Sequence, residues 1–86
     1  MPKIIATEKP DHSRKVDFKW LGQYVRHKRT SMGIGLADAA SLCGLSKNAY
    51  SNIELGKSAK VETLFIVLNN MGIELSVVEH EDDIWN

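Results

Sequence analysis

Glycine residues divide most of this chain into short segments, and this spacing limits the fold more than any other feature of the sequence. Each segment with helical periodicity is followed by a glycine: residues 18–31 by Gly33, 36–43 by Gly44, 47–55 by Gly56 and 61–71 by Gly72. At Gly44 two of the shortest segments meet, and such a tight turn needs a positive φ, which glycine adopts without steric penalty. The pattern predicts a bundle of small helices.

The residues at the segment starts and the apolar spacing agree with this prediction. Asp17 and Ser46 are good helix N-caps ahead of residues 18–31 and 47–55. In the fourth segment one helix face is apolar and is expected to face the core, whereas Ile66 and Val67 are expected to fall outside it. The expected inward residues of this segment are Val61, Leu64, Phe65, Leu68 and Met71.

The periodicity changes after Gly72. The sequence Ile-Glu-Leu-Ser-Val of residues 73–77 alternates between apolar and polar side chains, which is typical of a half-buried β-strand. The sequence has no second convincing strand. The backbone hydrogen-bonding groups at the edge of this strand must therefore pair with a second copy of the chain or with the N-terminal arm. We therefore expect a mainly α-helical fold with a C-terminal dimerisation strand over residues 73–79.

Length and composition limit the classes of protein. With 86 residues, of which 43% are hydrophobic, the chain is sufficient for one folded domain. Its longest apolar run, Leu64–Leu68, is far too short to span a bilayer, and no signal peptide is recognisable, so we expect a cytoplasmic protein. The single cysteine, Cys43, excludes an internal disulfide and a cysteine-based zinc site.

The formal charge of zero hides an asymmetry. All eleven Lys and Arg residues and five acidic residues lie within residues 1–60, giving +6, whereas residues 61–86 carry six acidic residues and no basic one, giving −6. A basic body favours a polyanionic partner such as nucleic acid. We expect a flexible arm over residues 1–16, a folded domain over 17–79 and a flexible acidic tail over 80–86.

The stretch from Leu36 to Leu55 has the pattern of a helix-turn-helix. Ala40 is small enough for the closest crossing of the two helices, and Gly44 suits the turn between them. Five further apolar residues of the stretch fall at inward places: Ala39, Cys43, Leu45, Tyr50 and Ile53.

These residues, together with the sequence from Ile53 to Lys57 and Val61-Glu62-Thr63-Leu64, resemble the XRE family, the phage repressor and Cro type of DNA-binding domain. The resemblance covers about residues 18–75 and implies a four- to five-helix bundle that binds operators as a dimer. With a predicted strand in place of the fifth helix, the chain is similar to HipB-like antitoxins. These proteins pair such strands across a homodimer, bind a HipA-like kinase toxin and repress their shared operon.

The resemblance places the third helical segment in the major groove of double-stranded DNA, where all four base pairs can be distinguished. Lys47 would then donate to guanine, Asn48 or Asn52 would pair with adenine, and Ala49 would touch a thymine methyl group. The base-reading residues expected from this comparison are Lys47, Asn48, Ala49, Ser51 and Asn52.

The resemblance also implies phosphate contacts from the loop after this helix and from the backbone amides at the start of the second one. The residues concerned are Leu36, Gly56, Lys57, Ser58 and Lys60. The family usually has a Ser or Thr cap followed by Gln at the second helix, whereas this chain has Gly35 and Leu36 there. A side-chain contact is therefore missing, and the basic arm is a candidate to compensate for it.

One further pair of residues follows from the same comparison. Arg29 and Glu54 match positions that form a structural ion pair between the first and third helices. The residues expected in a dimer interface, with core packing as the alternative, are Ile66, Val67, Ile73, Leu75 and Val77. In the acidic tail, Trp85 is a candidate contact for a toxin, because aromatic side chains dominate many interfaces.

The sequence gives little support for metal binding or for catalysis. His12, His27 and His80 lie at no ligand spacing, so we expect surface histidines and no metal. Cys43 is expected to be a small buried hydrophobe. Because the sequence also lacks a phosphate-binding glycine loop and a catalytic triad, we expect neither an enzyme nor a cofactor.

The sequence thus predicts a sequence-specific, dimeric transcriptional repressor that binds an inverted repeat and doubles as the antitoxin of a HipA-like operon. Two alternatives remain open at this stage. One is a toxin-neutralising interaction protein with weak DNA binding, which the lack of a polar side chain at Gly35 and Leu36 motivates. The other is a stand-alone phage-type repressor.

Overall fold

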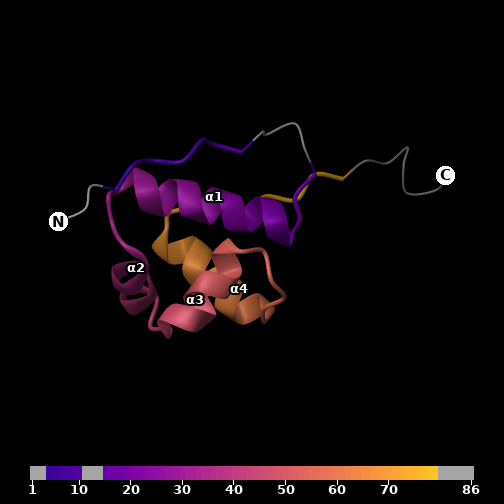
Figure 1. The fold of residues 1–86 in the computed structure, drawn as a ribbon. Coiled ribbons are helices and arrows are strands. Elements are labelled where there is room, and N and C mark those ends of the chain that lie inside the picture. The colour runs from indigo at the N-terminus through magenta and orange to yellow at the C-terminus, as the bar shows by residue number, and fades with distance from the viewer. Residues whose placement is uncertain (1–3, 11–14, 80–86) are drawn as a thin grey trace.

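A computed structural model of the chain describes residues 4–10 and 15–79, and this part of the chain is all-helical. The four helices are α1 (Phe18–Ser31), α2 (Leu36–Leu42), α3 (Lys47–Glu54) and α4 (Val61–Asn70) (Figure 1). The long α1 lies across the shorter helices, which form a second layer beneath it (Figure 1). The predicted helices are therefore confirmed, and within the described residues the bundle has four helices rather than five.

The helix starts follow from the predicted caps. Asp17 Oδ1 accepts a hydrogen bond of 2.7 Å from the Trp20 backbone N–H, and Ser46 Oγ accepts one of 3.1 Å from the Ala49 N–H. Each bond satisfies a backbone donor that a first helical turn leaves unpaired. Both N-caps thus lie where the sequence predicts them.

The core forms where α1, α3 and α4 meet, with α2 packed beside α3. Of the predicted inward residues of the helix-turn-helix, Leu45 is half-buried and the other four are buried. The buried apolar side chains are Leu21, Val25, Ala39, Ala40, Cys43, Tyr50, Ile53, Leu64, Val67, Leu68, Met71 and Ile73. The core thus closes around the motif within a single chain.

The prediction for the face of α4 is wrong in part. Val67 is fully buried, whereas Val61 and Phe65, expected inside, are 60% and 47% exposed. The buried stripe consists of Leu64, Val67, Leu68 and Met71 at helical spacing. Because α4 carries apolar residues on most of its circumference, the periodicity of its sequence fits two neighbouring faces, and only packing against α1 and α3 selects one.

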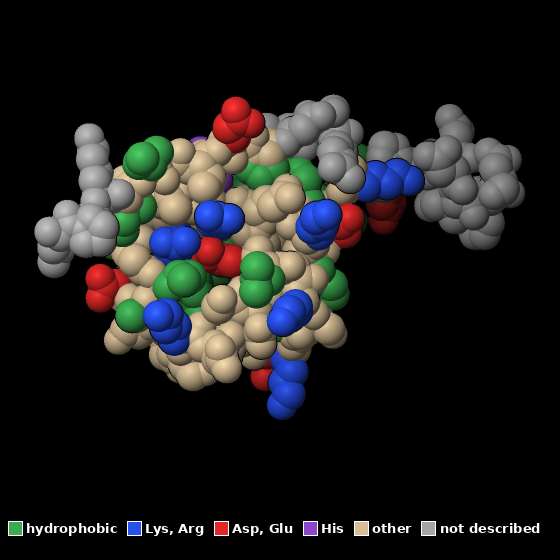
Figure 2. All heavy atoms as spheres, in the orientation of Figure 1, with side chains coloured by type: hydrophobic (Ala, Val, Ile, Leu, Met, Phe, Trp, Pro, Cys, Tyr) green, Lys and Arg blue, Asp and Glu red, His purple; other side chains and the backbone are tan. Residues whose placement is uncertain are grey.

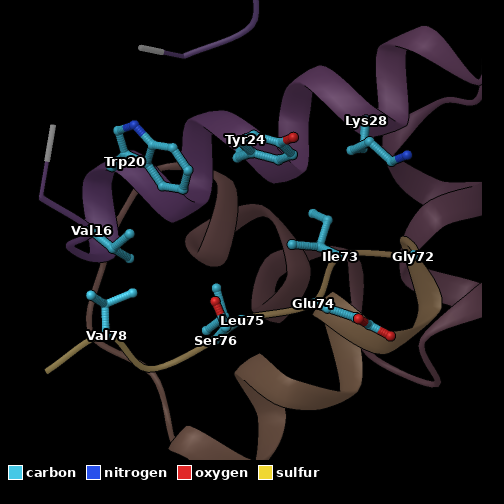
Figure 3. A pocket seen from close by; sticks show the side chains of 10 residues that line it. All are labelled: Val16, Trp20, Tyr24, Lys28, Gly72, Ile73, Glu74, Leu75, Ser76 and Val78. Carbon is cyan, nitrogen blue, oxygen red and sulfur yellow. The ribbon is translucent and has the colours of Figure 1, made fainter. Parts of the chain in front are cut away.

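The expected strand over residues 73–79 does not form in the single chain. Ile73 donates its backbone N–H to the Leu68 carbonyl at 2.9 Å and buries its side chain, after which the segment has no regular secondary structure. Figure 3 shows its residues Leu75, Ser76 and Val78 below α1, across a cavity of about 440 Å³ that Trp20 and Tyr24 also line. No neighbouring strand lies within the described part of the chain, so no β-ladder can form there.

The closest approach between helices occurs at Gly22, which the sequence analysis did not single out. A Cβ atom at this position would overlap the backbone carbonyl groups of Ile53 and Glu54 at the end of α3. At Gly56 a Cβ atom would lie 2.7 Å from Lys19 Cα. Gly22 on α1 and Gly56 in the loop after α3 therefore let the backbone of α1 rest directly on the end of α3 and on this loop.

We expect Gly22→Ala to destabilise the protein by about 1–3 kcal/mol, because the added methyl group meets backbone atoms that cannot move aside easily. At an exposed helical site the same substitution would stabilise by up to about 1 kcal/mol. Urea unfolding followed by circular dichroism measures the difference. Gln23→Ala, at the neighbouring exposed position of α1, is the control and should be close to neutral. Equal stability of the two variants would contradict the close contact.

Candidate nucleic-acid interface

The turn between α2 and α3 is short and is held by backbone hydrogen bonds. Gly44 has a φ of 68°, its N–H donates to the Ser41 carbonyl at 3.1 Å, and the Leu45 N–H donates to the Ala40 carbonyl at 2.9 Å. This is the positive φ that the sequence predicts for Gly44. Because Tyr50 and Ile53 are buried on the inner side of α3, the helix has only one orientation in which its apolar residues leave water.

The opposite side of α3 is polar and accessible. Lys47 and Asn48 are exposed near its start, and Ala49, Ser51 and Asn52 are half-buried. The structure therefore brings the five predicted base-reading residues together on one short helix. In this arrangement the ammonium and amide groups of Lys47 and Asn48 are free to meet hydrogen-bonding partners outside the protein.

The loop after α3 differs in one respect from the expectation. The backbone amides of Gly56 and Lys57 close the helix by donating to the carbonyls of Ile53 and Asn52 at 3.1 and 3.0 Å. These two amides are thus occupied within the protein, which leaves the side chains of Lys57, Ser58 and Lys60 as polar groups of this loop. All three side chains are exposed.

At the start of α2 no side chain caps the helix. The N-cap Gly35 makes no side-chain hydrogen bond to the helix. The side chain of Leu36 packs against the core while remaining partly accessible. Gly35 and Leu36 therefore contribute only backbone polar groups here, and the charged side chain of the first turn of α2 is that of Asp38.

Arg29 and Glu54 form the one ion pair among the described residues. Arg29 Nε lies 2.6 Å from Glu54 Oε2 and Nη2 lies 3.1 Å from Oε1, while Nη1 donates to the Ile34 carbonyl at 3.0 Å. Both side chains are less than a tenth exposed. The hydrogen bonds and charge of Glu54 raise the pKa of Arg29, so the guanidinium stays charged although it is buried. The pair joins α1 to α3 and to the connection that leads into α2.

Two buried titratable groups of the motif are inert at neutral pH. Burial raises the pKa of the Cys43 thiol and raises the pKa of the Tyr50 phenol well above its usual range. The Cys43 side chain therefore remains a neutral core residue, as the sequence analysis expects. Tyr50 Oη is buried without a hydrogen-bond partner among the described residues.

Positive charge surrounds the motif. Figure 2 shows Lys and Arg side chains spread over the face on which α3 lies, with exposed hydrophobic groups between them. Apart from Arg29, the basic residues of α1, α3 and the following loop lie at the surface: Lys19, Arg26, Lys28, Lys47, Lys57 and Lys60. Such a surface attracts polyanions.

The remaining predicted residues lie away from α3 or outside the described part. Of the expected interface residues, Val67 and Ile73 belong to the core of the single chain, whereas Ile66, Leu75 and Val77 are exposed. Trp85 lies outside the described residues, as do His12 and His80.

His27 is half-buried and holds part of the N-terminal arm. Its Nδ1 donates to the Thr7 carbonyl at 2.8 Å, and the Thr7 N–H donates to Thr30 Oγ1 at 3.0 Å. Lys9 Nζ lies 5.9 Å from the centre of the Tyr24 ring. In the described part of the chain no group of three or more His, Cys, Asp and Glu residues could hold a metal ion.

One surface residue beside the motif has no counterpart in the sequence analysis. Arg26 lines a hollow of about 150 Å³ together with Arg29, Leu36, Ser51, Glu54 and Leu55. Its position on α1, one turn before Arg29, is the signal in the sequence that places it near α3.

This geometry defines the class: a helix-turn-helix protein whose second helix presents a polar face amid basic residues. Residues 25–78, more than half of the chain, match the sequence model of the helix-turn-helix family. The chain belongs to this family, of the XRE type, and is a DNA-binding regulator. No protein in the comparison with curated sequences matches the chain. None of the described helices is long and apolar enough to cross a membrane.

We expect Glu54→Leu to destabilise the protein by about 3–5 kcal/mol, because it leaves the buried guanidinium of Arg29 without a counter-charge. The double variant Arg29→Met with Glu54→Leu should be more stable than the single one, since two apolar side chains can share the vacated space. Urea unfolding of both variants measures the two free energies. A double variant less stable than Glu54→Leu alone would contradict this account of the pair.

Proposed function

We propose that the chain is a sequence-specific transcriptional repressor that binds an inverted repeat as a homodimer. The observation that carries the proposal is the fixed orientation of α3, whose apolar side is buried by Tyr50 and Ile53 while Lys47 and Asn48 face solvent. A helix held in this way fits the major groove, and two copies would read half-sites about 34 Å apart or a multiple of that distance.

Within this proposal the residues of α3 and its loop have different tasks. Base edges are read by Lys47, Asn48, Ala49, Ser51 and Asn52. The phosphate backbone is held by the exposed side chains of Lys57, Ser58 and Lys60, next to Gly56, and by the backbone at Leu36. The first group sets sequence preference, and the second sets affinity and register.

The surface for a second copy is the exposed apolar area around α4 and the C-terminal segment. Ile66 and Leu75 are each 44% exposed and Val77 is 92% exposed, which is costly for apolar groups unless they are covered. The segment over residues 73–79 also lacks a β-ladder in the single chain. Pairing of this segment between two copies would cover both the side chains and the backbone.

We further propose that the repressor is the antitoxin of a HipA-like kinase toxin and regulates their shared operon. The support is the resemblance to HipB-like antitoxins in the sequence that follows α4. In this proposal Trp85 and the acidic tail contact the toxin. The lack of a polar side chain at Gly35 and Leu36, at the start of α2, favours one other function: a toxin neutraliser that binds DNA weakly without its partner.

The division of tasks can be tested by substitution. Lys47→Ala and Asn52→Ala should each relax the preference for the best site, at a cost of about 1–3 kcal/mol per lost base contact. Lys57→Ala should weaken binding to all duplexes about equally. Fluorescence anisotropy with a duplex that the wild-type chain enriches from a randomised library, and with single-base variants of it, measures both effects. Equal, sequence-independent losses for all three variants would contradict the groove assignment.

The partners can be found in one pull-down of the tagged full-length chain from its native host, with bound protein identified by mass spectrometry and bound DNA by sequencing. A kinase-like protein together with a palindrome from its own promoter is the expected result. DNA alone would indicate a stand-alone repressor, and protein alone would favour the neutraliser. A chain truncated before residue 80 should lose affinity for the kinase in calorimetry, and unchanged affinity would contradict the role of Trp85.

A further inference from the structure

One edge of α1 runs beside the motif and carries polar, mostly basic residues. Lys19, Gln23 and Arg26 are spaced by four and three residues, so their side chains lie on the same side of the helix. All three are exposed, although α1 buries its neighbouring residues Gly22 and Val25. We call Lys19, Gln23 and Arg26 the basic edge of α1.

The two cations of this edge lie next to different parts of the motif. Arg26 shares a hollow with Leu36 at the start of α2 and with Ser51 and Leu55 on α3. Lys19 lies against the loop after α3, since a Cβ atom on Gly56 would be 2.7 Å from its Cα. Along the helix axis the two residues are about 10 Å apart.

No carboxylate neutralises the charge of Arg26 within the described residues. Within the described residues its side chain makes no ion pair. Glu54, the one acidic group that lines the same hollow, is already bonded through both carboxylate oxygens to Arg29. The hollow therefore carries a net positive charge that is open to solvent, beside apolar groups of Leu36 and Leu55 that can support the stem of Arg26.

The hollow is lined by Leu36, which carries no polar side chain at the start of α2. Gly35 and Leu36 provide only backbone groups at the start of α2, as described above. A guanidinium in the adjacent hollow has five N–H donors in a planar fork, which matches phosphate oxygens well. By contrast, the arm residue Lys9 is placed over the ring of Tyr24.

We propose that the basic edge of α1 binds the DNA backbone, with Arg26 holding a phosphate beside the start of α2 and Lys19 extending the phosphate contacts of the loop after α3. The proposal rests on the proposed DNA-binding function and adds a surface outside the helix-turn-helix itself. Arg26 would hold the duplex against α3 without reading its sequence.

The test compares Arg26→Gln with Lys28→Gln, which removes the same charge from the same helix. Lys28 lines the cavity between α1 and residues 72–78 and lies on a different side of α1 from Arg26. The probe is the fluorescein-labelled duplex that the wild-type chain enriches from a randomised library, titrated at several salt concentrations. Arg26→Gln should weaken binding about tenfold or more at low salt and reduce the slope of log K against log salt by about 0.9 per bound chain.

Further variants separate a phosphate contact from other roles. Arg26→Lys should lose less affinity than Arg26→Gln, and Lys19→Gln should reduce the salt slope in the same way. Single-base variants of the duplex should all weaken by the same factor in Arg26→Gln. Unchanged thermal unfolding of each variant shows that the fold is intact, as expected for exposed side chains.

Three results would overturn the proposal: no loss in Arg26→Gln, the same loss in Lys28→Gln, or a changed base preference in Arg26→Gln. The same loss in Lys28→Gln would show that the affinity depends only on the overall charge of the chain. A changed base preference in Arg26→Gln would show that Arg26 reads bases. A wild-type chain that enriches no duplex would instead contradict the proposed function itself, and with it the basis of this inference.

Discussion

The buried ion pair of Arg29 and Glu54 determines how α3 is held. Its two hydrogen bonds fix α3 against α1, and the third bond of Arg29, to the Ile34 carbonyl, fixes the connection that begins α2. Three elements thus depend on one guanidinium. Buried pairs of this kind add little net stability, because both charges lose their hydration, but they penalise arrangements in which either partner is left alone. The pair therefore defines the orientation of the motif more than it stabilises the fold.

Close backbone contact completes this arrangement. Gly22 lets α1 approach the carbonyl groups at the end of α3, and Gly56 does the same from the loop side. Tyr50 and Ile53 bury the inner side of α3, and Lys47 and Asn48 on its other side are exposed. The polar face of α3 and the basic edge of α1 consequently lie on adjoining parts of one surface.

The sequence predicts those features that depend on local rules. Asp17 and Ser46 cap their helices as expected, and the inward residues of the helix-turn-helix are recognisable by spacing alone. The face of α4 was mistaken because its apolar residues surround most of the helix. The strand after Gly72 depends on a neighbouring backbone that the chain does not provide. Gly22 acquires its significance only from the helix packed beside it, so no local pattern distinguishes it. Arg26 is recognisable only through its spacing from Arg29 on α1. The DNA contacts of α3 stay predictions.

The burial of Val67 and Ile73 within one chain changes how assembly and folding are related. Proteins whose core is completed only by a partner have no stable folded monomer, and their stability depends on concentration. Here the core closes around Val67 and Ile73 without a partner, so pairing of two copies would be an equilibrium between folded units. Occupancy of a two-fold symmetric site would then rise with the square of the free protein concentration when dimers are scarce. A modest change in synthesis or turnover would produce a larger change in repression.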